Sequence, residues 1–273
     1  MLALLAWLPG CAAALLLLSQ PASSRRSQLA VSMGEVMEEV ATGELSEGPG
    51  SFASEDMGDE AWQDAFLEQT EDIDPSWTPE ESAARLQQLM QDGSLLLTDM
   101  QDRPERFFLA HRLLARRLVD GFGIRFTVQY NLFAGSILGL GGQEQVSRLP
   151  EYQKSATLGC FALTERSAGV SSGLVVNTSA VWDADRQVFV LHTPNEDARK
   201  FWISQGMTAT MMVVIADLTV EGKSHGPHAF VMPLRDSVTG ELTAGVSVGD
   251  MGVKTIANDL DNAWYTKCPP PSP

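Results

Sequence analysis

Few residues of this chain have types and spacing that could support hydrolysis, phosphate binding or metal binding. The sequence has no GxSxG nucleophile elbow and no GxxxxGK[ST] phosphate-binding loop. Its three cysteines, Cys11, Cys160 and Cys268, lie far apart, which predicts neither a disulfide framework nor a metal-binding CxxC pair. With four histidines and no HExxH motif, we expect no metal site. His225 and His228 flank a Gly-Pro pair without carboxylate or cysteine companions, so we interpret them as turn and core residues.

The charge of the chain argues against one class of partner. The formal net charge of the 273 residues is −16, and residues 34–105 hold 20 acidic residues against two arginines. The acidity is therefore local, and the sequence offers no basic face for nucleic acid. A hydrophobic content of 44% is sufficient for a packed core.

Both ends of the chain differ in composition from its middle. Residues 1–33 begin with an almost wholly apolar stretch, residues 1–18, which we interpret as a signal or targeting segment or as a membrane contact. Residues 34–75 are acidic and rich in Gly, Ser and Glu, which predicts a disordered linker. Residues 268–273 form a proline-rich tail.

Helical signals fill the next segment, residues 76–150, which we expect to form an N-terminal helical domain. Thr78 before Pro79, with Glu81 three residues later, is typical of a helix start with a capping box. Apolar residues at helical spacing predict two further helices, from about Pro104 to Leu118 and from Thr127 to Leu140.

The texture changes near residue 150, where β-branched runs begin to alternate with turns. These runs predict strands within residues 158–165, 174–183, 187–194, 208–220, 228–236 and 245–252. Six short strands in about a hundred residues favour an antiparallel barrel or sandwich over a parallel sheet. The predicted fold class is therefore α+β, with the helical domain followed by an antiparallel β-barrel or sandwich middle domain over residues 151–267.

Several sequence segments in the same order carry a resemblance to a known family. The first three are Leu158-Gly-Cys-Phe-Ala-Leu-Thr-Glu165, Ser167-Ala-Gly169 and Lys200-Phe-Trp-Ile-Ser-Gln-Gly206. Three later segments are Gly226–Asp236, Gly249–Lys254 and Asn258–Ala263. Over roughly residues 76–267 the chain resembles the acyl-CoA oxidase and dehydrogenase family, in its N-terminal helical and middle β-domains. The three later segments are similar to the oxidase branch.

This resemblance implies FAD as cofactor and assigns roles to a few residues. Trp202 would supply a flat apolar wall, the Thr164 hydroxyl and neighbouring backbone groups would bind the flavin, and Ser204 would contact it near N5. Glu165 takes a structural role. The full set implied for FAD is Phe161, Leu163, Thr164, Trp202 and Ser204, and the set implied for the acyl-CoA thioester is Gly169 and Ser171.

The implied reaction is the FAD-dependent α,β-dehydrogenation of fatty acyl-CoA to trans-2-enoyl-CoA, with molecular oxygen reoxidising the flavin to give hydrogen peroxide. The reaction needs a carboxylate base, and no catalytic residue is identifiable in this chain. In the family a C-terminal helical domain carries that glutamate, so we expect this chain to be truncated before it. A full-length form would be a homodimer.

Other interpretations of the same sequence stay open. One is an acyl-CoA dehydrogenase that passes electrons to a protein acceptor. Others are a non-catalytic acyl-CoA-binding or interaction protein built on the same β-domain, and a nonfunctional fragment. The family predicts a peroxisomal location, whereas the hydrophobic N-terminus favours the secretory route, an organelle or a membrane tether.

Overall fold

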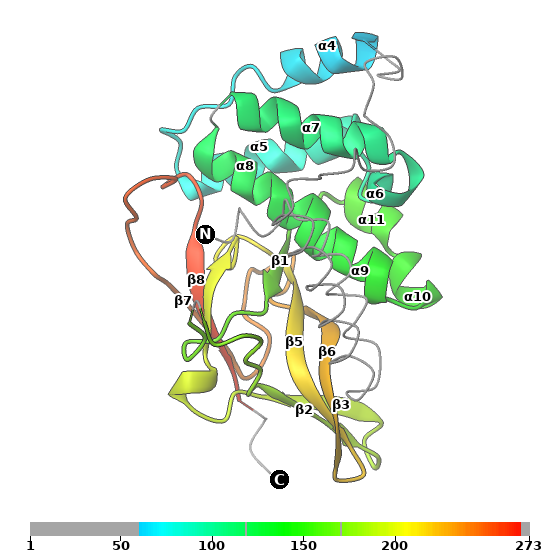
Figure 1. Cartoon of the computed structure of the whole chain (residues 1–273), viewed down its shortest axis with the longest axis vertical. Helices are drawn as coiled ribbons and strands as arrows, with labels where there is room; N and C mark the ends of the chain where they lie inside the picture. Colours follow the sequence, from blue (N-terminus) through cyan, green and yellow to red (C-terminus); the bar gives the residue numbers. More distant parts are fainter. Residues whose placement is uncertain (1–59, 118, 170, 269–273) are drawn as a thin grey trace, which may run out of the picture.

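The structure is a computed structural model that describes residues 60–117, 119–169 and 171–268. Helices occupy the first half of this part and strands the second, and Figure 1 shows the helices stacked over one end of the strands. The expectations for residues 1–33, for most of the acidic segment and for the tail beyond Cys268 lie outside the described residues.

The helical part contains several short elements and one long, interrupted helix. Its elements are α4 (Glu60–Gln69), α5 (Pro79–Asp92), α6 (Asp99–Asp102), α7 (Pro104–Arg116), α8 (Asp120–Thr127), the π-helix η1 (Val128–Phe133), α9 (Ala134–Leu140), α10 (Gln143–Val146) and α11 (Leu149–Lys154).

The start of α5 confirms the capping signal in the sequence. Thr78 Oγ1 accepts a hydrogen bond from the Glu81 N–H at 3.2 Å, and the Thr78 N–H donates to Glu81 Oε2 at 2.8 Å. Pro79 occupies the first helical position, where its missing N–H costs no hydrogen bond. Gly93 ends the helix in the left-handed region, at φ +72°.

Helix α4 corrects the prediction of a disordered linker that extends to residue 75. Trp62 and Phe66 lie four residues apart, so they share one helix face, and both side chains are buried. Their rings stack with centroids 5.2 Å apart, and Phe66 also meets Phe126 of α8. The acidic composition concealed this amphipathic helix because Trp62 and Phe66 are few among many charged residues.

A single chain segment, α8–η1–α9, runs along the junction with the β part. The sequence predicted one helix from Thr127 to Leu140, but the structure starts it at Asp120 and widens it into a π-helix over Val128–Phe133. At this point β1 comes very close, because a Cβ on Gly159 would lie 2.2 Å from the Phe133 ring. The expected burial of this segment is confirmed, since Tyr130 and Phe133 are fully covered.

The strands form two sheets within the described residues, and these do not close into a barrel. Their bounds are β1 (Gly159–Ala162), β2 (Ser179–Asp183), β3 (Val188–His192), β4 (Lys200–Ser204), β5 (Met211–Val220), β6 (Lys223–Pro233), β7 (Val246–Asp250) and β8 (Asn262–Lys267), with a short 3₁₀ helix η2 (Glu196–Ala198) before β4. Strand β5 is central to the larger sheet, with β6 on one edge and β1 and β2 in succession along the other, and β3 outside β2. The smaller sheet has the order β4-β8-β7.

The strand directions correct the prediction of a wholly antiparallel fold. Strands β1 and β2 both run parallel to β5, whereas β6 and the smaller sheet are antiparallel. Each of the six expected segments overlaps a strand, although β6 begins at Lys223, before its expected segment, and the sequence missed β4 and β8. Strand direction depends on pairing between distant segments, so local alternation of residues could not show it.

One continuous core joins the two parts. Residues Met212–Ala216 of β5 are all buried, and the core continues through β1 into the helices. In the described part of the chain, no helix is both long and apolar enough to cross a membrane.

Candidate functional site

The residues that follow β1 lie beside β4. This β1–β4 edge brings together two of the segments that carry the family resemblance, Leu158–Glu165 and Lys200–Gly206. The Phe201 N–H donates to the Thr164 carbonyl at 2.9 Å. The neighbouring pair, Glu165 and Lys200, forms an isolated antiparallel bridge. Two segments about 35 residues apart are therefore held side by side.

The five residues expected to bind a cofactor all come from this edge. Phe161 lies in β1, and Leu163 and Thr164 follow it directly. Trp202 and Ser204 belong to β4. All except Trp202 are half-buried, so each retains a surface that a ligand could contact.

Trp202 has an unusual backbone for its residue type. Its φ is +60°, in the left-handed region, where a residue with a side chain costs about 1–2 kcal/mol. The pairing register with β8 shifts between Lys200 and Ile203, and the Trp202 N–H donates to Met251 Sδ at 3.3 Å. The indole is 52% exposed. A strained residue with an uncovered aromatic ring is typical of a functional site.

Ser204 ends β4 opposite Asn262, the first residue of β8. The Ser204 hydroxyl donates to Asn262 Oδ1 at 2.8 Å, and the two residues are register partners. Asn262 is 7% exposed. Asn262 lies in the sequence segment Asn258–Ala263, whose pattern did not predict that this residue belongs to the site.

Lys200, at the other end of β4, is a fully buried cation. Its Nζ donates to Glu165 Oε1 at 3.0 Å, to the Leu163 carbonyl at 3.0 Å and to the Ile215 carbonyl at 2.8 Å. Burial lowers the pKa of Lys200, and the Glu165 carboxylate opposes that effect. Lys200 thus fixes the backbone immediately before Thr164.

Glu165 is the acceptor partner of this buried cation. Its carboxylate accepts hydrogen bonds from the Asn177 N–H at 2.8 Å, the Asn177 side-chain amide at 3.1 Å and the Thr178 N–H at 2.8 Å. Burial alone would raise the pKa of Glu165, but Lys200 and these donors together hold it below its usual value. A carboxylate with these partners has the structural role that the resemblance gave it.

Gly169 and Ser171, the expected thioester contacts, lie in the loop between β1 and β2. Both are exposed, and the Gly169 N–H donates to Ser172 Oγ at 3.0 Å. The start of this loop is tied to the segment before β4, because the Arg166 N–H donates to the Arg199 carbonyl at 2.8 Å. This hydrogen bond places the start of the loop beside the residues that lead into β4. Among the described residues, no hydrogen bond joins Gly169 directly to Trp202 or Ser204.

The histidine and cysteine residues do not assemble a site in the described part. Cys160 is completely buried in β1, and burial raises the pKa of its thiol. His228 Nδ1 lies 2.9 Å from the Gly226 carbonyl. His225 and His228 both lie within β6, which corrects the prediction of a turn between them. No three His, Cys, Asp or Glu side chains of the described residues gather as metal ligands.

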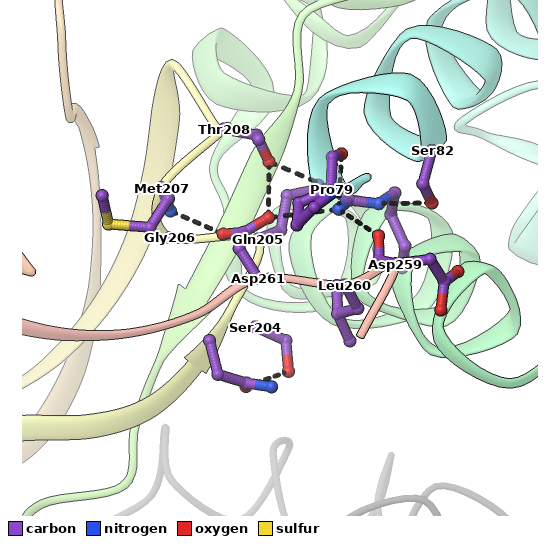
Figure 2. Close-up of polar contacts among 12 residues, drawn as sticks. Pro79, Ser82, Ser204, Gln205, Gly206, Met207, Thr208, Asp259, Leu260 and Asp261 are labelled. Atoms are coloured by element: carbon purple, nitrogen blue, oxygen red, sulfur yellow. Dashed lines mark hydrogen bonds and ion pairs between the residues drawn. The ribbon is translucent and has the colours of Figure 1, made fainter. Parts of the chain in front are cut away.

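Sequence reasoning missed a buried ion pair between the helical and β parts. Arg125 of α8 donates to Asp261 Oδ1 at 3.1 Å, and both side chains are buried. Figure 2 shows Thr208 and Met207 converging on Asp261, with Ser204 nearby. The available signal was a single arginine within the otherwise apolar residues 121–126.

The exposed Trp202 ring and the half-buried hydroxyls of Thr164 and Ser204 lie along one edge, an arrangement that could contact a flat ligand with polar groups. No family model matches the chain.

Two curated relatives are oxidases. Acyl-coenzyme A oxidase of Saccharomyces cerevisiae is 43% identical over 148 residues, covering 52% of this chain and 20% of the relative. Peroxisomal acyl-coenzyme A oxidase 3 of Homo sapiens is 37% identical over 135 residues, covering 49% of this chain and 19% of the relative. The chain thus matches about a fifth of the length of these relatives.

Solved structures give the same result for the fold. Acyl-CoA oxidase 1 from Yarrowia lipolytica matches 76% of this chain and 31% of its own, with a TM-score of 0.63 and 29% identity. Acyl-CoA oxidase-1 of Caenorhabditis elegans, complexed with FAD and ATP, matches 76% and 32%, with a TM-score of 0.58 and 27% identity. The expected resemblance is confirmed: over the matched part, this chain is similar to acyl-CoA oxidases in sequence and in fold.

Proposed function

We propose that this chain forms the flavin-binding part of an acyl-CoA oxidase. The complete reaction converts a fatty acyl-CoA and molecular oxygen to trans-2-enoyl-CoA and hydrogen peroxide. The observation that carries the proposal is the pairing of the Thr164 segment with β4 beside the exposed Trp202. It occurs in a chain that is 43% identical to an acyl-CoA oxidase over 148 residues.

The chemistry of this edge fits FAD. A flavin presents a flat ring system with hydrogen-bonding groups along one side, and it needs both apolar contact and polar partners. Trp202 offers the flat apolar surface, and the Thr164 and Ser204 hydroxyls offer polar contacts, supported by the backbone of Phe161 and Leu163. FAD, when bound, supplies the two-electron acceptor for the dehydrogenation. The residues of this chain hold and orient it.

The remaining parts of the proposal follow the same resemblance. Gly169 and Ser171 line the thioester end of the acyl-CoA. The catalytic base is a glutamate of a C-terminal helical domain, and the full-length form is a homodimer. The boundaries of the helical domain at 76–150 and of the middle domain at 151–267 belong to the same proposal, with α4 added to the helical domain. The name of the human relative supports a peroxisomal location, and a membrane contact through residues 1–18 is the competing localisation.

Flavin binding is the first property to test. The full chain is purified with excess FAD, passed through a desalting column, and its visible spectrum is recorded. We expect a retained flavin band in the wild type, and loss of that band in Trp202→Ala and Ser204→Ala. A matched control is Trp182→Ala, which removes a tryptophan of β2 in the larger sheet and should leave the band unchanged.

Addition of a long-chain acyl-CoA in air then distinguishes the alternatives. Bleaching that recovers with formation of peroxide supports an oxidase, and bleaching that recovers only with a protein electron acceptor supports a dehydrogenase. If FAD binds but acyl-CoA does not bleach it, this chain binds the cofactor without a catalytic base of its own. A folded wild type that retains no FAD contradicts the proposal.

A further inference from the structure

Helix α7 presents three exposed side chains on one face, which we call the basic stripe. Phe108, Arg112 and Arg116 follow one another at four-residue intervals, so they lie on the same side of the helix. All three residues are exposed, and Phe108 is 58% exposed. The opposite side of α7 packs into the core through Phe107, Ala110, Leu113 and Leu114. The basic stripe thus offers two cations and an aromatic ring to a partner with anionic groups.

A highly acidic segment precedes the helix that packs on α7. Residues 34–59 contain eight acidic residues and no Lys, Arg or His, which gives them a formal charge of −8. The segment leads directly into α4, which begins at Glu60. A segment tethered to the same chain has an effective concentration on the order of millimolar, so even weak attraction favours its association with the basic stripe. Its charge and its tether both make residues 34–59 a well-matched partner for this face of α7.

The packing of α4 places the end of the acidic segment near the start of α7. The Arg106 guanidinium lies 5.5 Å from the centre of the Trp62 ring, and Arg117 Nη2 donates to the Glu71 carbonyl at 2.7 Å. The two helices therefore run side by side in the same direction, at the end of the molecule away from the strands (Figure 1).

The distances along the two chain segments match. With a rise of about 1.5 Å per residue, Arg112 and Arg116 lie about 9 and 15 Å further along the axis of α7 than Arg106. An extended chain covers about 3.3 Å per residue, so residues 55–59 alone span about 16 Å. This short stretch holds three of the eight acids, Glu55, Asp56 and Asp59. It is long enough to bring their carboxylates to both arginines.

We propose that the acidic segment, residues 34–59, docks on the basic stripe of its own chain and covers it against other anions. The acids of α4 do not fill this role, because they are exposed on the side of α4 opposite its buried residues Trp62 and Phe66; they are Glu60, Asp64 and Glu68. Each exposed ion pair strengthens an association by a factor of about 1.4–5. Two or three such pairs acting together make docking measurable and sensitive to salt.

The test replaces both arginines of the stripe by lysine in the full chain, Arg112→Lys with Arg116→Lys. The variant keeps the positive charges and supplies amines that a carbodiimide couples only to carboxylates in contact with them. We expect a coupled product of single-chain mass in which mass spectrometry finds α7 joined to residues 34–59. In 1 M NaCl the Debye length falls to about 3 Å, so the yield drops by about fivefold or more.

Two other substitutions calibrate the coupling. Arg186→Lys places a lysine at an exposed site in the turn between β2 and β3, and it gives no product with residues 34–59. Arg166→Lys places one beside Glu196, with which Arg166 forms an exposed ion pair at 3.1 Å, and it shows that the reagent detects such pairs.

Charge reversal gives a second measurement. In Arg112→Glu with Arg116→Glu, a protease that cuts after glutamate cleaves residues 34–59 several-fold faster than in the wild type, because the segment is no longer held on α7. Arg186→Glu changes the net charge per site in the same way and leaves the rate unchanged.

Several results overturn the inference. One is the absence of coupling between α7 and residues 34–59 while the Arg166→Lys variant couples, and another is a yield that 1 M NaCl does not lower. A product of double mass assigns the stripe to a second copy of the chain. Vesicles containing phosphatidylserine that bind the wild type but not the charge-reversed variant assign it to a lipid surface. None of these measurements involves FAD, so their outcome leaves the proposed function untouched.

Discussion

Replacing Lys200 with Met tests whether the buried ion pair holds the candidate site in shape. The substitution keeps a long, unbranched side chain but removes three hydrogen bonds, to Glu165 and to the carbonyls of Leu163 and Ile215. It leaves the Glu165 carboxylate buried without a cation. Breaking a buried pair in this way costs about 3–5 kcal/mol, so we expect a loss of that size in the free energy of unfolding.

A double-mutant cycle isolates the pair itself, measured by urea unfolding of the full chain at pH 7. Glu165→Leu combined with Lys200→Met should cost clearly less than the sum of the two single variants, because each single variant leaves one buried charge alone. Lys223→Met is the control, since Lys223 is exposed on β6. If Lys200→Met lies within about 1 kcal/mol of the wild type, or if the two single effects simply add, the pair does not act as argued.

The pH dependence gives an independent check on the same pair. In the wild type the folded-state pKa of Glu165 lies below its unfolded value of about 4.5, so its contribution is present above that pH and is lost as the pH falls through the folded pKa. In Lys200→Met the carboxyl is buried without a cation, which raises its folded pKa, so protonation then relieves the cost of burial. The stability gap between wild type and variant should therefore narrow as the pH falls from 7 to 4. A gap that widens would refute the assignment of a paired, ionised Glu165.

Three further changes test the helical core, the junction and the site. Burial lowers the folded-state pKa of His111 from 6.5 to about 4, so stability should fall by up to about 3 kcal/mol as the pH drops from 6.5 to 4. His111→Leu should flatten that part of a urea-unfolding profile, and an unchanged slope would mean that the ring titrates normally. Gly159→Ala places a methyl group 2.2 Å from the Phe133 ring and should cost about 1–3 kcal/mol, seen as a lower Tm, whereas an unchanged Tm would show that the ring yields without cost. Trp202→Gly removes the left-handed strain and should leave the chain as stable as before or about 1 kcal/mol more stable, while FAD affinity falls; tighter FAD binding would contradict the role of the indole.

The sequence predicted those parts of the fold that depend on near neighbours. The capping box at Thr78 and Glu81 involves residues three apart, so the pattern and the structure agree in detail. The strand segments also follow from local alternation. The parallel pairing of β1 and β2 with β5 does not, because β5 inserts beside segments that precede it by about 40 to 50 residues. Helix α4 was missed because a composition average gives Trp62 and Phe66 no more weight than the acidic residues around them.

In the candidate site too, the residues that lie in short local motifs could be predicted, whereas those that depend on distant partners could not. Trp202 and Thr164 were identified because each lies in a short contiguous motif. Asn262 lies 58 residues from Ser204, and Asp261 lies 136 residues from Arg125. A polar side chain in these positions has the same local pattern as a solvated one, and only the folded chain shows that it is buried and paired.

Strand β4 shows why the described part of the chain keeps two fully buried ion pairs, Lys200–Glu165 and Arg125–Asp261. Well-packed hydrophobic side chains of similar volume would often stabilise the fold as much as a buried ion pair does, so stability alone does not account for the two pairs. Between the two pairs lies Trp202, whose left-handed backbone and half-exposed ring both oppose folding locally. Such a conformation persists only where the surroundings leave no alternative. The Lys200–Glu165 ion pair fixes one end of β4, and the Arg125–Asp261 ion pair fixes the turn at its other end. Both pairs make directional hydrogen bonds, which apolar side chains could not supply. The two buried ion pairs are costly to desolvate, but together they restrict the candidate flavin-binding edge to a single geometry.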